Sequence, residues 1–138
     1  MRNSNPIHVV TIDHLVLRTS QLEAMVHFYH GILACTLERA QPEIGLTQLR
    51  AGDALIDIVA LDSKLGRLGG SAPKQDGRNV DHFCLQIESL SETALIEYLE
   101  SHQLIHSEFA ERYGAQGFGR SIYVEDPEGN VVELKPNS

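Results

Sequence analysis

The stretch Ser121–Lys135, SIYVEDPEGNVVELK, sets the organisation of the chain. Two short runs rich in β-branched side chains flank Asp126–Asn130, where Pro127 fixes φ and Gly129 accepts a positive φ. This pattern predicts two strands joined by a tight turn. The second strand carries Glu133 between apolar neighbours, and a carboxylate on such a strand needs a partner.

The chain contains an earlier copy of the same pattern. Asp57 lies in 54–61, a second strand after a turn, at the position that corresponds to Glu133. Upstream, IDHLVL with His14 is repeated as VDHFCL with His82. The histidines are 68 positions apart and the carboxylates 76, which fits a longer loop in the second copy. An internal repeat of this kind predicts two copies of one structural unit.

The repeat divides a single domain of 138 residues into module one (8–61), a linker (62–79) and module two (80–136). Each module is expected to have the order βαβββ, which makes the fold class α+β with one curved mixed sheet. Two capping boxes predict the helix starts, Ser20 with Glu23 and Ser89 with Glu92. We expect strands at 8–17, 36–39, 46–49, 54–61, 80–87, 104–108, 121–124 and 131–135, and a glycine-rich loop at 109–119.

Composition excludes several classes of function. The formal charge of −8 disfavours nucleic-acid binding, which needs clustered Lys and Arg. No apolar run approaches the roughly 20 residues that span a bilayer, so we expect no membrane association. Cys35 and Cys84 lie among apolar residues and are expected to be small buried side chains, not a disulfide. We expect a cytoplasmic protein.

The repeated polar residues predict a metal site in the cleft between the modules. Two imidazoles with one or two carboxylates suit Zn²⁺, Ni²⁺, Mn²⁺ or Fe²⁺ and leave room for a substrate. The predicted ligands are His14, His82, Asp57 and Glu133. Asp13 and Asp81 precede the two histidines and are expected to point to the opposite face of their strands.

The segments IDHLVL, VDHFCL and RSIYVEDPEGNVVELK, in a doubled βαβββ order, resemble the vicinal oxygen chelate superfamily, which includes glyoxalase I, methylmalonyl-CoA epimerase and extradiol dioxygenases. The resemblance covers about residues 9 to 136. It implies that His14, His82 and Glu133 are metal ligands and that Glu133 also acts as catalytic base, with Asp57 second. Asp57 stands where glyoxalase I has Glu and the epimerase has Gln. Being one methylene shorter, it ligates either directly or through water.

What the resemblance implies about activity is a metal-dependent lyase or isomerase of the glyoxalase type, acting on a small oxygenated substrate. The metal polarises neighbouring oxygens, a carboxylate removes a proton, and an enediolate is stabilised. Glutathione is a candidate cosubstrate. Three residues in or beside the glycine-rich loop are candidates for substrate contact: Arg112, Tyr113 and Arg120.

Other functions on the same scaffold are an Fe²⁺ extradiol dioxygenase, a fosfomycin-type resistance enzyme and a metal-free small-molecule binding protein. Two His and one Glu satisfy the dioxygenase. The fosfomycin type has no acid at the position of Asp57 and extends further beyond the last Glu, and the binding protein lacks the ligands. Short relatives commonly form homodimers, so we expect a homodimer whose site lies within one chain or between two.

Overall fold

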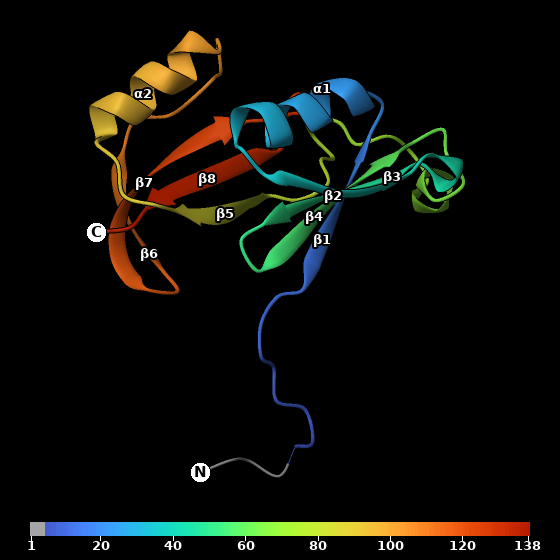
Figure 1. The fold of residues 1–138 in the computed structure, drawn as a ribbon, viewed down its shortest axis with the longest axis horizontal. Coiled ribbons are helices and arrows are strands. Elements are labelled where there is room, and N and C mark those ends of the chain that lie inside the picture. Colours follow the sequence, from blue (N-terminus) through green and yellow to red (C-terminus); the bar gives the residue numbers. More distant parts are fainter. Residues whose placement is uncertain (1–4) are drawn as a thin grey trace.

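The computed structural model describes residues 5–138, which form two four-stranded sheets with few helices (Figure 1). Module one contains, in chain order, β1 (His14–Thr19), α1 (Leu22–Val26), the π-helical turn η1 (His27–Ile32), β2 (Thr36–Gln41), η2 (Pro42–Ile44), β3 (Leu46–Ala51) and β4 (Ala54–Ala60). After η3 (Gly66–Gly69), module two contains β5 (His82–Ile87), α2 (Glu92–Ser101), β6 (Ala110–Gly114), β7 (Gly117–Glu125) and β8 (Val131–Pro136).

The two sheets have the same topology. Their strand orders are β1-β4-β3-β2 and β5-β8-β7-β6. In each sheet the first and last strands of the module pair in parallel and the other neighbours are antiparallel. A parallel pair needs a crossover connection, and the helix after the first strand lies in it. The predicted α+β class with doubled βαβββ order is therefore confirmed. The single curved sheet that we expected is instead two separate sheets, one in each module.

Alternation along the strands separates a helix-covered face from an open face. Leu17 on β1 and Leu134 on β8 belong to one buried cluster that also contains Met25 of α1 and Leu99 of α2. Both helices lie on the same side of the sheets (Figure 1). The alternate residues of β1, β4, β5 and β8 face the other way. We call that side the open face of each module.

The turn predicted at 126–130 also joins the two modules. The Asp126 carboxylate accepts hydrogen bonds from the backbone N–H groups of Glu128 and Asn130, and Gly129 has a φ of 85°. The same carboxylate accepts a buried 2.7 Å hydrogen bond from the hydroxyl of Tyr29 in module one. Burial, together with Asp126, raises the pKa of Tyr29 well above its usual value, so the phenol remains a donor.

Both helix starts differ from the sequence prediction. The Ser20 hydroxyl donates to Glu128 across the module boundary, and α1 begins after Gln21 without a side-chain cap. In module two the cap is Ser91, whose hydroxyl accepts from the N–H of Ala94, whereas Ser89 donates to the carbonyl of Asn137. The capping-box predictions were wrong because Ser20 and Ser89 bond to partners distant in the sequence and do not cap, so each helix begins later than predicted.

Strand boundaries also required correction at three places. β1 begins at His14, so 8–13 are coil ahead of the strand (Figure 1), although the carbonyl of Asp13 still accepts from the N–H of Leu55 on β4. The predicted strand at 104–108 supplies only an isolated bridge from His106 to Val124. The predicted loop at 109–119 is instead the β6–β7 hairpin. Its glycines masked the alternation by which strands are recognised in sequence.

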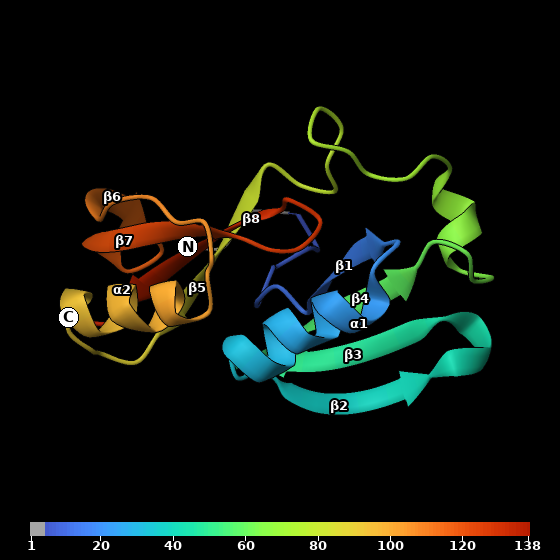
Figure 2. The same ribbon diagram turned by 90° about the horizontal axis from the view of Figure 1, so that it is seen from above.

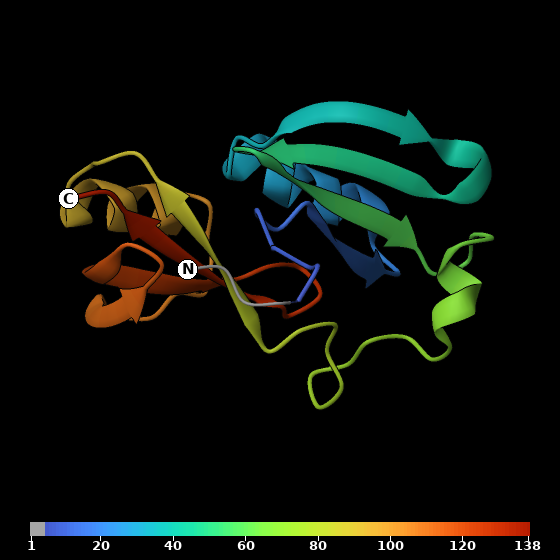
Figure 3. The ribbon, with the colours of Figure 1, turned by 90° about the horizontal axis from the view of Figure 1, so that it is seen from below.

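The linker runs from β4 to β5 around one side of the molecule (Figures 2 and 3). Arg18 of β1 fastens it, because its guanidinium donates to the carbonyls of Gly69, Gly70 and Ser71. Asn79 exchanges hydrogen bonds with the backbone of Arg18. The long connection is therefore tied to module one before it enters module two. No helix within residues 5–138 is long and apolar enough to cross a membrane.

Candidate metal centre

The two predicted His–carboxylate pairs occupy equivalent places in the two sheets. In module one, His14 is opposite Leu55 and Asp57 follows two residues later on β4. In module two, His82 is opposite Val131 and Glu133 follows two residues later on β8. Identical offsets in identical parallel ladders place each imidazole diagonally beside its carboxylate on the open face.

The module-one pair combines an exposed imidazole with a buried carboxylate. The His14 side chain is 47% exposed, whereas Asp57 is only 5% exposed. The amide of Gln48 on β3 donates to both Asp57 oxygens at 3.1 and 3.2 Å. The hydrogen bond to Asp13, and then the charge of Asp57, raise the pKa of His14. We call His14 with Asp57 the half-site of module one, and the equivalent pair, His82 with Glu133, the half-site of module two. The half-site of module one attracts positive charge.

The module-two pair has the same character and a closer contact. Glu133 is buried, and its Oε1 lies 3.5 Å from Nε2 of His82. The hydroxyl of Ser121 on β7 donates to Oε2 of Glu133 at 2.7 Å. The ring of His82 meets that of Tyr123 edge-on, with 5.4 Å between centroids. Neighbouring strands thus hold both potential ligands in place.

The aspartates before the histidines were assigned to the wrong face by strand alternation. Asp13 Oδ2 lies 2.7 Å from Nδ1 of His14, and Asp81 Oδ2 lies 2.7 Å from Nδ1 of His82. Both aspartates sit just before the first residue of a strand, where the pleat does not yet fix their direction. A carboxylate on Nδ1 holds the proton there and leaves Nε2 free as a ligand, as in many metal sites.

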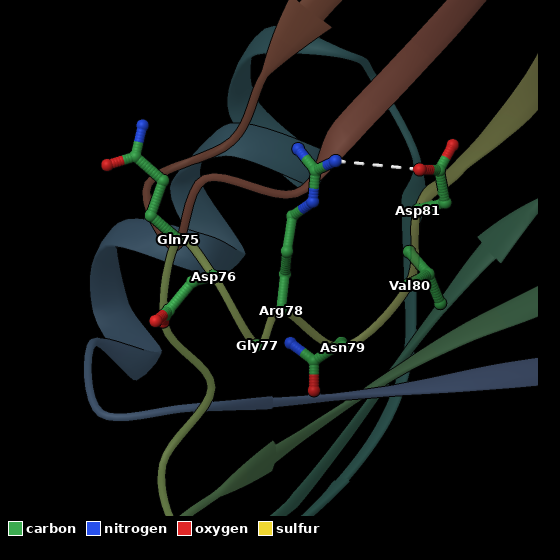
Figure 4. Close-up of a pocket in the computed structure, with 7 residues that line it drawn as sticks. All are labelled: Gln75, Asp76, Gly77, Arg78, Asn79, Val80 and Asp81. Carbon is green, nitrogen blue, oxygen red and sulfur yellow. Dashed lines mark ion pairs between the residues drawn. The ribbon is translucent and has the colours of Figure 1, made fainter.

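The linker contributes to this orientation in module two. Residues 75–81 line a shallow cavity of about 380 Å³ (Figure 4). Within it the Arg78 guanidinium points toward Asp81, with 3.6 Å between Nη2 and Oδ1. Hydrogen bonding to His82 lowers the pKa of Asp81, and Arg78 adds to the effect. The cavity therefore adjoins the carboxylate that orients His82.

The two half-sites do not meet within one chain. Among residues 5–138, no three His, Cys, Asp or Glu side chains are grouped closely enough to hold a metal ion. The larger cleft between the modules, about 910 Å³, is lined mainly by apolar residues such as Leu15, Ile56 and Phe83, and by none of the four predicted ligands. Each half-site offers one imidazole and one carboxylate, a donor set that fits a borderline divalent cation but does not complete its coordination.

The three candidate substrate residues have different surroundings. Arg112 stacks on Tyr123, with its Cζ 4.1 Å from the ring centroid, beside the Glu133 network. Tyr113 is 75% exposed and packs edge-on against Phe118 near the hairpin tip. Arg120 forms an ion pair with Glu92 of α2. Of the three, Arg112 lies nearest to the predicted ligands.

One cysteine departs from the expected burial. Cys35 is buried as predicted, but Cys84 is exposed on the open face of β5, opposite Glu133. Partial desolvation, with the Glu133 charge second, raises the pKa of Cys84 to about 11. The thiol is therefore protonated at neutral pH and is a poor nucleophile and ligand.

The structure also adds residues that the sequence did not single out: Gln48, Ser121 and Lys135. Gln48 is paired in register with Asp57, and Ser121 lies two residues before the partner of Glu133. Polar side chains on strands adjacent to a predicted ligand were the available signal. It could be used only once the strand register was known.

These observations agree with comparison to known proteins. Residues 11–134 match the family model described as the Glyoxalase/Bleomycin resistance protein/Dioxygenase superfamily, and the chain belongs to this superfamily. No protein of curated function matches the chain in sequence.

Several solved structures share the fold. An integron cassette protein from the mobile metagenome of V. cholerae is 24% identical, with a TM-score of 0.72 over 96% of this chain and 98% of that one. A virulence protein from Salmonella typhimurium is 22% identical, with a TM-score of 0.71 over 96% and 100%. A lactoylglutathione lyase from Agrobacterium tumefaciens is 18% identical, with a TM-score of 0.68 over 94% and 96%. At these identities the likeness concerns the fold.

Proposed function

We propose that the protein is a metal-dependent lyase or isomerase of the glyoxalase type that acts on a small oxygenated substrate. The observation that carries this proposal is the pair of equivalent His–carboxylate half-sites, each with a carboxylate on Nδ1 of its histidine. Two structural histidines would not need the same register, the same buried acid and the same orienting aspartate.

We further propose that the active protein is a homodimer. Each half-site is incomplete in its own chain, and each lies on an open face that a second copy could approach. Module one of one copy and module two of the other would then contribute His14, Asp57, His82 and Glu133 to one centre. A single chain leaves the coordination of the metal incomplete. A second copy would supply the other half of the donors.

A divalent ion held there would act as a Lewis acid that polarises adjacent substrate oxygens and acidifies the neighbouring C–H bond. The residues supply the rest of the chemistry. Glu133 is the proposed base, because Ser121 fixes one of its oxygens and leaves the other near His82. Asp57, held by Gln48, is the second carboxylate. The aspartates keep the imidazole protons away from Nε2.

The lactoylglutathione lyase among the structural neighbours supports testing glutathione as cosubstrate with a 2-oxoaldehyde. The described cysteines are both unpaired, which fits a reducing compartment, and the cytoplasm is the proposed location.

The decisive experiment measures metal content in mixed dimers. His14→Ala and Glu133→Ala chains carrying different tags are co-expressed, and the heterodimer is isolated beside both variant homodimers and the wild type. If the centre is shared, the heterodimer retains one intact site, because the unaltered module one of one chain meets the unaltered module two of the other. Both variant homodimers lose metal.

The other outcomes are equally informative. A heterodimer without metal, beside a loaded wild type, would place the centre within one chain. A wild type that takes up no Zn²⁺, Ni²⁺, Mn²⁺ or Fe²⁺ would contradict the enzyme and favour a binding protein. Bound iron would direct activity assays to catechols, whereas nickel or zinc would direct them to methylglyoxal with glutathione.

A further inference from the structure

Two cationic side chains lie on the open face of module two, close to Glu133. Lys135 follows Glu133 by two residues on β8, so the two side chains share a face, with Cα atoms about 6.6 Å apart. Arg112 Nη1 donates to the Ser121 hydroxyl at 3.0 Å, and that hydroxyl donates to Glu133. One hydroxyl group therefore links the guanidinium to the proposed base.

Neither cation makes a direct ion pair with a carboxylate of the described residues. Within residues 5–138, no ion pair within 4.0 Å involves Arg112 or Lys135. Lys135 is only 7% exposed, and its ammonium donates to the carbonyls of Arg112 and Gly117 at 3.2 and 2.8 Å. An ammonium has three protons, so one remains available. A buried cation without a counter-anion is costly, which favours an anion at this place.

Arg112 also retains free donors. Nη1 is committed to the carbonyl and hydroxyl of Ser121, while stacking on Tyr123 fixes the plane of the guanidinium. Its Nε and Nη2 make no hydrogen bond to any residue that the structure describes. Free N–H groups on a fixed guanidinium plane suit a carboxylate or phosphate.

The β6–β7 hairpin leaves room for Lys135. A Cβ at Gly114 would lie 2.8 Å from the ammonium nitrogen, and one at Gly119 would lie 2.9 Å from Cε. Module one has no such arrangement, because Val59 stands where module two has Lys135. The pair of Arg112 and Lys135 is therefore a property of module two and not of the repeat.

We propose that Arg112 and Lys135 form an oxyanion subsite beside the half-site of module two, and that the substrate carries a carboxylate or phosphate group in addition to the oxygens that face the metal. The second part rests on the proposed function, whereas the subsite itself does not. A substrate of this class would place its anion over the hairpin and its reactive carbon near Glu133.

The test compares three probes that share a 2-hydroxycarboxylate head: lactate, malate with a second carboxylate, and 3-phosphoglycerate with a phosphate. Calorimetry on the metal-loaded full chain should show malate or 3-phosphoglycerate binding about tenfold or more tightly than lactate, as one or two charge-assisted hydrogen bonds provide. The tighter of the two identifies the preferred anion. Arg112→Gln and Lys135→Met should abolish the preference, and Lys74→Gln, at an exposed lysine, should keep it.

Binding measurements on metal-free protein test the subsite independently of the proposed function. Inorganic phosphate should bind the metal-free wild type and the Lys74→Gln control more tightly than Arg112→Gln, even if no metal site exists. Two results with the three probes would overturn the subsite: equal affinities in the wild type, or a preference that survives in Arg112→Gln. An absence of phosphate binding to the metal-free wild type would also overturn it. Circular dichroism checks folding. If Lys135→Met fails to fold, Arg112→Gln decides alone.

Discussion

The two modules place a histidine and a carboxylate by the same strand register but surround them differently. In module one the residues beside Asp57 on the open face are largely aliphatic: Val16, Val59 and Leu46. In module two the corresponding residues are Cys84, Lys135 and Ser121. A repeat can therefore preserve the geometry of a histidine–carboxylate pair while the rest of each face diverges.

We infer from this difference that the two open faces have separate roles. Module two holds Glu133 in a network with Ser121 and Arg112, so it combines the proposed base with cationic groups. Module one holds Asp57 through the single amide of Gln48, beside apolar surface. We expect the polar end of a substrate over module two and its apolar end over module one.

The largest expected difference is in metal affinity, between variants of the two buried carboxylates. Glu133→Ala should weaken metal binding by about a hundredfold or more, because a ligand contributes at least as much as an outer-shell partner. Asp57→Ala should cost about tenfold, since the shorter side chain ligates less directly. Competition with a chelator of known affinity measures both, with Glu111→Ala as control on exposed β6. Equal losses would show that the half-sites are equivalent in function.

The next contrast concerns the orienting aspartates, where the modules should behave alike. Asp13→Asn and Asp81→Asn should each weaken metal binding by about 10–100-fold, because the imidazole loses the acceptor that holds its proton on Nδ1. The same chelator competition applies, and Asp53→Asn, in the exposed β3–β4 turn, serves as control. Unchanged affinity in both variants would mean that the aspartates do not set the tautomer.

The contacts between modules also differ in strength. Tyr29→Phe should lower the free energy of unfolding by about 1–3 kcal/mol, because Asp126 loses a donor in a buried site. Tyr98→Phe removes a hydrogen bond to the carbonyl of Ile32 at a 43% exposed side chain, and should cost about 0.5–1.5 kcal/mol. Urea unfolding measures both. A larger cost at Tyr98 would locate the main inter-module contact at α2.

The smallest expected effect is the contribution of His106, in module two, to the pH dependence of stability. Hydrogen bonds to the Ser107 carbonyl and then to Glu100 raise the pKa of His106 above 6.5. The stabilisation is therefore fully present below pH 6.5 and is lost as pH rises through the higher folded-state pKa. His106→Gln should flatten the stability profile between about pH 6 and 8. A slope that His106→Gln leaves unchanged would contradict this assignment.

The strand faces that carry the candidate ligands could be inferred from the sequence, because side chains alternate along a strand with a period of two. The repeated IDH and VDH segments, with Asp57 and Glu133 at matching distances, predicted two modules and the faces that carry the four candidate ligands. The β6–β7 hairpin was missed because its glycines weaken the alternating pattern, and the helix caps were misplaced because Ser20 and Ser89 bond to distant partners.

The doubled βαβββ order, the turn at 126–130 and the two histidine–carboxylate pairs could be predicted from the sequence, since they depend on local periodicity and turn chemistry. That the two half-sites do not meet within one chain became evident from the packing of the two modules. The tertiary structure alone placed Asp13 and Asp81 on the histidines, and Arg112 and Lys135 beside Glu133. Such placements depend on how separate strands and loops pack, and a one-dimensional pattern does not encode those distances.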